Sequence, residues 1–295
     1  MLINAQRLVD KARVKLLDTS GQQQGNSWSD TSILDALNEE QDGLVADCIE
    51  GSEDYFMAKK DLALQDGVNS YPLFGGFLLL RKLEFVPAGS ADPASDSQGV
   101  IESRLIEGVE GAAGIASSSD YYYAIAGDNL DIQPTPGAGG GTMSAWIIRA
   151  PGPILLEKPA TIPTADTFTL SSEDAPYEDD IMVGTIFQVT AGIGIKQRRR
   201  CTAYVGSTRL VTLESAFTTP LDATSVVASI SRLPQLFHQL LYLGAVVRCL
   251  SDARENTDEI KALYNPMYER YIDFVERARS YAQRGAVPFD PEDGI

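Results

Sequence analysis

Histidine and paired cysteines are scarce in this sequence of 295 residues, which has one histidine, His238, and three cysteines, Cys48, Cys201 and Cys249. A single histidine excludes a multi-histidine metal site. The cysteines form no CxxC pair and are odd in number, which argues against a disulfide framework. Cys48 and Cys249 fall on or beside apolar helix faces, so we expect buried thiols. Cys201 follows three arginines, and a structural thiol is favoured there over a thiolate nucleophile.

Long apolar runs are also absent. The run at residues 77–80 is cut off by Arg81 and Lys82 and is far shorter than a membrane span. The first residues reach Arg7 and Asp10 without the apolar core of a signal peptide. We therefore expect a soluble protein that is made in a reducing cytoplasm and has no membrane partner.

Basic residues are few. The chain has 24 Lys and Arg against 41 Asp and Glu, for a net charge of −17. Affinity for phosphates comes from Lys and Arg, so this balance argues against a free nucleic-acid binder. It favours solubility and repulsion between monomers until they assemble.

Helical periodicity is strongest near the carboxyl end, over residues 233–284. Apolar residues recur there at the spacing of one helix face, at Leu233, Leu236, Phe237, Leu240, Leu241, Val247 and Leu250. His238 lies one position past Phe237 on this helix, and we expect it to be a packing residue. A second run begins at Ile260 and is interrupted by Pro266, which predicts either a kink or a new helix capped by Asn265.

Two helices near the amino end could cover this stripe. Residues 5–17 have one apolar side, and a second helix should follow Ser29, a good N-cap, and end near Gly51. The four helical segments are therefore expected to form one antiparallel bundle.

Extended segments occupy the middle of the chain. Residues 61–149 alternate in polarity between turn signals and predict a small antiparallel sheet. Prolines between 151 and 163 form a stiff linker, and five short strand candidates follow between Thr167 and Ile230. These strands predict an inserted small β-barrel or β-sandwich. The expected class is thus α+β, with a core of residues 1–155 and 231–284, a β-domain of residues 156–230 and a tail of residues 285–295.

Candidate sites for chemistry are weak, and we predict no catalytic residue, metal site or cofactor. The glycines at 137–141 lack the Lys-Ser/Thr of a phosphate-binding loop. The acidic residues at 173–174 and 178–180 lack the spacing of a calcium loop. Lys196, Arg198, Arg199 and Arg200 form the one basic cluster, which is either a solvated face or, for Lys196, Arg198 and Arg200, a contact with an acidic patch of a neighbouring subunit.

The carboxyl-terminal tail combines apolar and acidic residues. Gly285 is a natural stop for the last helix. Beyond it, Val287, Pro288, Phe289 and Asp290 are expected either to fray or to dock onto a partner, with Phe289 as the anchor.

Several segments, read in order, resemble the head-to-tail adaptor (connector, or head-completion) proteins of tailed bacteriophages. They are residues 12–18 (ARVKLLD), 28–41 (WSDTSILDALNEEQ), 71–72 (YP), 130–136 (LDIQPTP), 146–151 (WIIRAP) and 233–238 (LPQLFH). The stretch 187–230 resembles a second, widespread phage-structural β-module. Its marks are residues 190–194 (TAGIG), 199–204 (RRCTAY), 206–208 (GST) and 220–225 (PLDATS). Shorter adaptors lack this module.

The resemblance implies a non-enzymatic virion protein that forms a dodecameric ring below the portal after DNA packaging. The ring would bind the portal protein, carry tail or nozzle proteins, and let DNA pass through its channel without specific binding. Two alternatives are a virion-associated tail protein of the glycan-binding or depolymerase type and an oligomeric scaffold of unknown partner. The glycan-binding alternative would need an aromatic platform or a carboxylate pair in a cleft, and neither can be identified in the sequence.

Overall fold

The structure is a computed structural model that describes residues 3–20, 28–51, 56–73, 75–89, 98–99, 101–102, 121–127, 129–137, 140–171 and 175–282. The chain divides into two compact units. The split unit comprises Met1–Tyr55 and Ala150–Ile295, and the continuous unit comprises Phe56–Arg149. The fold is α+β, as the sequence predicts: four α-helices and antiparallel sheets are present among the described residues.

The first two helices of the split unit begin at side-chain caps. Helix α1 is Ala5–Ser20 and helix α2 is Asp30–Gly51. The Ser29 hydroxyl accepts the backbone N–H of Ser32 at 3.0 Å, so the N-cap expected at Ser29 is confirmed. The Asn4 side chain accepts the N–H of Arg7 at 3.0 Å, and this cap of α1 was not recognised in the sequence.

The carboxyl-terminal helices follow a short 3₁₀ turn, η2, at Gln235–Phe237. Helix α3 is His238–Asp252 and helix α4 is Asp258–Ala282. Helix α4 runs through Pro266, so the alternative of a new helix capped by Asn265 is wrong. Proline removes one N–H and one intrahelical hydrogen bond, and the long helix tolerates that loss.

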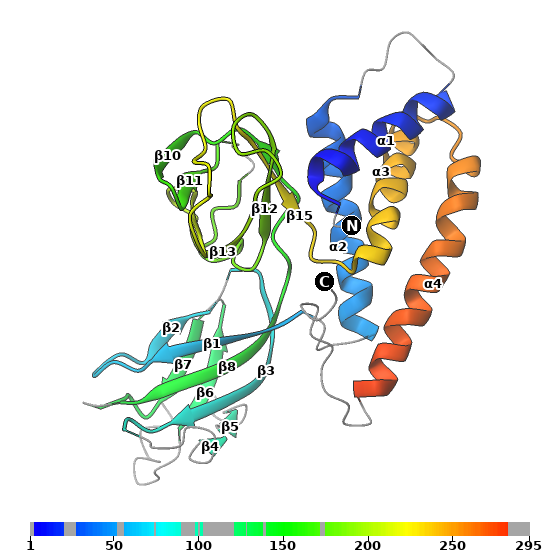
Figure 1. Cartoon of the computed structure of the whole chain (residues 1–295). Coiled ribbons are helices and arrows are strands. Elements are labelled where there is room, and N and C mark those ends of the chain that lie inside the picture. Colours follow the sequence, from blue (N-terminus) through cyan, green and yellow to red (C-terminus); the bar gives the residue numbers. More distant parts are fainter. Residues whose placement is uncertain are drawn as a thin grey trace. The chain divides into compact units, whose positions relative to one another are not determined.

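Helix α3 lies against each of the other three helices (Figure 1). The apolar stripes expected on α2 and α3 are buried: Leu37 and Leu44 of α2 and Leu240 and Leu250 of α3 are at most 1% exposed. We call helices α1–α4, which pack together through α3, the helical lobe.

The continuous unit contains two sheets rather than the single sheet that the sequence predicts. One has the order β1-β8-β3-β4 and the other the order β2-β7-β6-β5. The bounds of the first are Met57–Ala63 (β1), Thr142–Arg149 (β8), Phe77–Val86 (β3) and Gln98–Gly99 (β4). Those of the second are Ser70–Pro72 (β2), Asn129–Gln133 (β7), Tyr122–Ala126 (β6) and Ile101–Glu102 (β5). Pairing is antiparallel except between β5 and β6.

A single apolar core joins these two sheets. Leu62 and Ala145 from the first sheet and Leu130 and Ile132 from the second belong to one buried cluster. Alternation along each strand places one row of apolar side chains toward this core. Periodicity of 2 identifies such strands, but it does not indicate which strands pair.

The second part of the split unit, which we call the β-lobe, is one sheet of seven strands in the order β10-β11-β14-β13-β12-β15-β9. The bounds are Leu156–Glu157 (β9), Thr161–Thr164 (β10), Thr167–Thr169 (β11), Ile186–Ala191 (β12), Arg198–Val205 (β13), Leu210–Leu213 (β14) and Val226–Ile230 (β15). The five strands expected between Thr167 and Ile230 are present.

Of the two forms expected for this domain, a β-barrel or a β-sandwich, the barrel is wrong, because the outer strands of this sheet, β10 and β9, do not pair with each other among the described residues. The sheet nevertheless bends over its own core. Phe168 of β11 and Phe187 of β12 meet edge to face, with ring centroids 5.3 Å apart, and both are fully buried. Bulges in the pairing of β12 with β15 and of β13 with β14 allow such bending.

Amide side chains of the helical lobe bind the β-lobe and its linker. Asn38 of α2 brackets the backbone of Ile154, accepting its N–H at 2.6 Å and donating to its carbonyl at 3.1 Å. The Asn4 amide donates to Gln188 of β12 at 2.9 Å. Ser231 donates to Gln41 of α2 at 2.6 Å where the chain returns to the helices.

Candidate functional site

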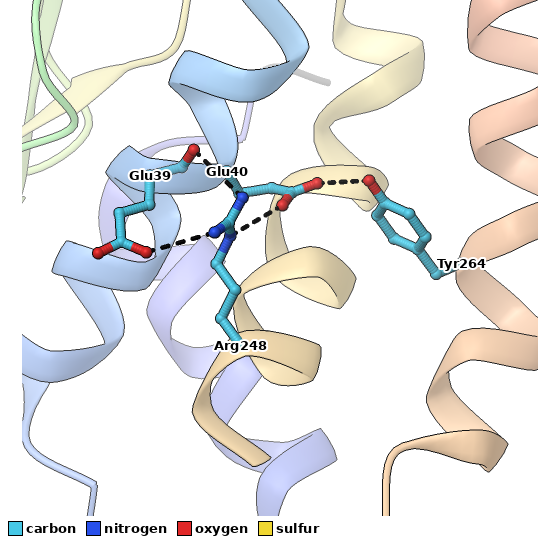
Figure 2. A network of polar contacts seen from close by, with 4 residues as sticks. All are labelled: Glu39, Glu40, Arg248 and Tyr264. Atoms are coloured by element: carbon cyan, nitrogen blue, oxygen red, sulfur yellow. Dashed lines mark hydrogen bonds and ion pairs between the residues drawn. The ribbon is translucent and has the colours of Figure 1, made fainter. Parts of the chain in front are cut away.

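A charged network lies between three helices of the helical lobe (Figure 2). Arg248 of α3 donates from Nε to Glu40 Oε2 at 3.1 Å and from Nη1 to Glu39 Oε2 at 3.3 Å. The other oxygen of Glu40, Oε1, accepts the Tyr264 hydroxyl of α4 at 2.6 Å. The Glu40 side chain is only 8% exposed, whereas that of Arg248 is 39% exposed. Both oxygens of a buried carboxylate are thus satisfied by one cation and one hydroxyl.

Three tyrosines of α4 donate to α2. Besides Tyr264, Tyr268 donates to Asp47 Oδ2 at 2.8 Å and Tyr271 donates to the carbonyl of Leu44. Burial, followed by the bond to Glu40, raises the pKa of Tyr264 far above its ordinary value. Burial and the bond to Asp47 raise the pKa of Tyr268 to about 12. The hydroxyls of Tyr264 and Tyr268 therefore stay protonated donors near neutral pH.

This arrangement joins helices and has no feature of an acid–base site. Glu40 is held by Arg248 and Tyr264, and the tyrosine pKa values are moved away from neutrality, not toward it. Sequence reasoning missed the network. The tyrosines occur at i, i+4 and i+7, and Tyr264 and Tyr271 belong to the apolar run that begins at Ile260. No local signal pairs Glu40 with Arg248. A hydroxyl-bearing residue at each of three successive turns was the available clue.

His238, Cys48 and Cys249 are buried, as the sequence predicts. His238 is 0% exposed, and its Nε2 bonds to the Leu233 carbonyl at 2.9 Å. Burial lowers the pKa of His238 below its ordinary value of 6.5, and its Nδ1 is a buried atom with no partner among the described residues. Burial raises the pKa values of Cys48 and Cys249 to about 11. Cys201 lies in the core of the β-lobe, as a structural thiol would.

The basic cluster is divided by the strand. Arg198 and Arg200 belong to one face of β13, and Arg199 belongs to the other by alternation. Arg199 turns to the loop after β14, donating to the Ala216 carbonyl at 3.0 Å and lying over the Phe217 ring at 5.8 Å. Lys196 is exposed in the preceding turn with φ 74°. Arg198 and Arg200 thus share one face of β13, apart from Arg199, and Lys196 lies in the turn before the strand.

Other sequence hypotheses fall partly outside the described residues. Val287, Pro288, Phe289 and Asp290, as well as the acidic pair at 173–174, lie there. In the part of the chain that is described, no group of three or more His, Cys, Asp or Glu side chains has the arrangement of a metal site. The described glycines near residue 140 connect β7 to β8, as expected for a loop.

None of the helices in the described ranges is both long and apolar enough to cross a membrane.

Comparison with known proteins gives one family. Residues 3–187, more than half of the chain, match the family described as SU10 adaptor protein. No curated protein matches the sequence. The match runs through α1, α2, the continuous unit and the first part of the β-lobe, and it includes most of the motifs that suggested a head-to-tail adaptor. This chain belongs to the SU10 adaptor protein family, a family of structural head-to-tail adaptors of bacteriophages.

Proposed function

We propose that this protein forms a homo-oligomeric ring, a dodecamer, at the portal vertex of a phage head, where it extends the DNA channel and carries tail or nozzle proteins. The observation that carries this proposal is the family match over residues 3–187. A head-to-tail adaptor binds portal and tail proteins and is part of the virion. The ring, its stoichiometry and the DNA channel go beyond the family match and are part of our proposal.

The charge of the chain supports a conducting channel. A net charge of −17 leaves few cations for phosphates, so DNA would slide through such a ring without binding. Counterion release by Lys and Arg is the main source of non-specific affinity for DNA, and here it is largely missing.

In this proposal the adaptor core comprises residues 1–155 and 231–284, with the four helices as one antiparallel bundle. The hydrogen bonds from Tyr264, Tyr268 and Tyr271 to α2 support a firm helical core. Residues 156–230 are an inserted domain, and Lys196, Arg198 and Arg200 of this domain contact a neighbouring subunit.

We also propose that the tail, residues 285–295, docks onto the portal or a neighbouring subunit. Phe289 is the anchor, Val287 and Pro288 flank it, and Asp290 faces a basic group. Proline lowers the entropy that an extended segment loses on docking.

Capture by DNA-filled, tailless heads tests the adaptor role and the tail together. Wild-type protein should cosediment with such heads. Deletion of residues 286–295 should abolish capture and leave the melting temperature of the free protein unchanged. Failure of wild-type protein to bind heads would refute the adaptor role, whereas full capture of the truncated protein would refute only the tail's part in it.

A further inference from the structure

The turn between β12 and β13 exposes two large apolar side chains. Ile193 is 49% and Ile195 is 54% exposed, and Lys196 beside them is also exposed. We call residues 191–196 the tip. Two neighbouring isoleucines in solvent cost free energy that burial in an interface would recover, at about 25 cal/mol per Å² of apolar surface.

The tip is held in one conformation. Gly192 and Gly194 have φ values of 77° and 81°, and a Cβ atom on Gly192 would overlap the backbone of Thr224. The Ser225 hydroxyl donates to the Ile193 carbonyl at 3.0 Å. The Gln197 side chain exchanges two hydrogen bonds, each 3.1 Å long, with the backbone of Thr219. The isoleucines are therefore presented by an ordered turn, which lowers the entropy lost on docking.

Positive charge surrounds the tip. Lys196 lies within it, and Arg198 and Arg200 follow on one face of β13. Two carboxylates lie at this end as well, because Glu214 accepts the Arg200 N–H at 3.3 Å and Asp222 accepts the Thr224 N–H at 2.9 Å. Within residues 191–196 the exposed charged residue is Lys196, so the tip itself is apolar and carries one cation.

The other end of β13 has the opposite charge. Tyr177 is 68% and Val205 is 40% exposed, and Glu178, Asp179 and Asp180 lie beside them. We call these five residues the acidic end. The Gly206 N–H donates to Asp179 at 2.8 Å, which fixes the segment on the turn after β13. Arg209, the one cation at this turn, lies over the Tyr177 ring at 5.1 Å and donates to its hydroxyl at 2.6 Å.

The two ends are complementary but cannot meet within one copy. The eight residues of β13 separate them, and the seven steps between these residues, at about 3.3 Å each, span roughly 23 Å. A surface that fits a different surface of an identical chain makes a head-to-tail contact, and contacts of this kind form rings when the rotation between successive copies closes.

We propose that the tip of one copy docks onto the acidic end of the β-lobe of the next copy. Ile193 and Ile195 pack against Tyr177 and Val205, and Lys196 faces the acidic residues. This inference rests on the proposed ring and names the surface that links its subunits.

Cysteine cross-linking tests the contact. The native cysteines are all buried, and Ile193 and Tyr177 are exposed, so Ile193→Cys and Tyr177→Cys should fold. Cα atoms must lie within about 7 Å for a disulfide, so these two cysteines can join only between copies. The double variant, oxidised both as concentrated free protein and on heads, should give a ladder of dimers, trimers and larger species. Each single variant should give dimers at most.

Absence of a ladder under both conditions would overturn the inference. Capture of wild-type protein by heads is scored separately, so the adaptor role can survive that result. A ladder from free protein supports the contact even if heads do not capture the protein.

A charge exchange provides an independent test. Lys196→Glu and Glu178→Lys should each weaken assembly about tenfold, because each places like charges in contact. An equal mixture of the two variants should assemble again, because unlike charges then meet at every contact of an alternating ring. Lys261→Glu, an exposed change on α4, is the matched control and should have no effect. No rescue in the mixture would contradict a tip-to-acidic-end contact.

Discussion

At the scale of single residues, the Glu40 carboxylate is the best-defined polar centre of the helical lobe. Tyr264→Phe removes the hydroxyl that donates to Glu40 Oε1 and leaves a buried oxygen without that donor. We expect the free energy of unfolding to fall by about 1–3 kcal/mol. Denaturant unfolding followed by circular dichroism measures this change.

Tyr177→Phe is the matched control for that substitution. It also removes a tyrosine hydroxyl bonded to a charged group, Arg209, but in an exposed position. Its cost should stay below about 0.5 kcal/mol. Equal costs for the two substitutions would show that burial of Glu40 does not matter.

His238 should make the protein sensitive to mild acid. Burial lowers its folded-state pKa below 6.5, so below about pH 6.5 the unfolded chain binds a proton that the folded chain does not. The contribution of His238 to the free energy of unfolding is complete above pH 6.5 and is lost as the pH falls. His238→Gln keeps a donor for the Leu233 carbonyl and does not titrate.

The comparison of His238→Gln with wild type isolates this effect from the carboxylates. Melting temperatures measured from pH 8 to pH 5 should fall more steeply for wild type. Parallel curves for the two proteins would refute the assigned role of His238.

Sequence reasoning worked where the signal is local. Ser29 was identified as a cap because a capping side chain acts within one turn of its own position. For Pro266 the sequence predicted either a kink or a new helix, because proline is costly in a helix interior. Helix α4 continues through Pro266, because its packing outweighs that cost. Glu40 and Arg248 could not be paired from the sequence. They are 208 positions apart, and only the tertiary fold brings them together.

At the scale of elements, the approach of α2 to α3 depends on Gly244. Replacing a glycine inside a helix by alanine normally stabilises it by about 0.5–1 kcal/mol. A Cβ atom on Gly244 would instead overlap the Glu40 side chain. Gly244→Ala should therefore destabilise the protein, by about 1–3 kcal/mol.

Gly43→Ala is the control from the facing helix. Its Cβ atom would lie 3.8 Å from Arg248 Nη2, an ordinary contact, so this substitution should stabilise the protein by up to about 1 kcal/mol. The two alanine variants should shift the melting temperature in opposite directions. A stabilising Gly244→Ala would contradict the close packing of α2 on α3.

The β-lobe should be removable. Leu156 of β9 pairs with Ala228 of β15, so the chain leaves and returns at neighbouring points. A short Gly/Ser linker in place of residues 156–230 keeps Ser231, which donates to Gln41. The shortened protein should be soluble and retain its helical circular dichroism. Loss of the helical signal would show that the helices need the β-lobe to fold.

Element types were easier to predict than their pairing. The alternation of residues 121–126, 129–133 and 143–149 gave strands close to those observed, but the division into two sheets was missed. A strand's period reveals that one face is buried, and it does not reveal which neighbour shares that face. The open β-lobe was mistaken for a possible barrel for the same reason.

At the scale of the whole molecule, the protein combines a helical core, in which tyrosine hydroxyls bond α4 to α2, with a β-lobe that has opposite charge at its two ends. The tyrosine bonds to α2 hold the helical core together, while the tip and the acidic end remain available for neighbours. Assembly from an acidic monomer then needs local contacts strong enough to overcome the repulsion of a net charge of −17 per copy. Salt weakens that repulsion, which at 0.1 M is largely screened beyond about 10 Å.

Electron microscopy of the purified protein, alone and mixed with its portal, tests the central claim most directly. We predict a ring of protein copies seated coaxially on the portal, with a central channel wide enough for DNA. Protein that stays monomeric beside unaltered portals, at micromolar concentration and near-physiological salt, would contradict it.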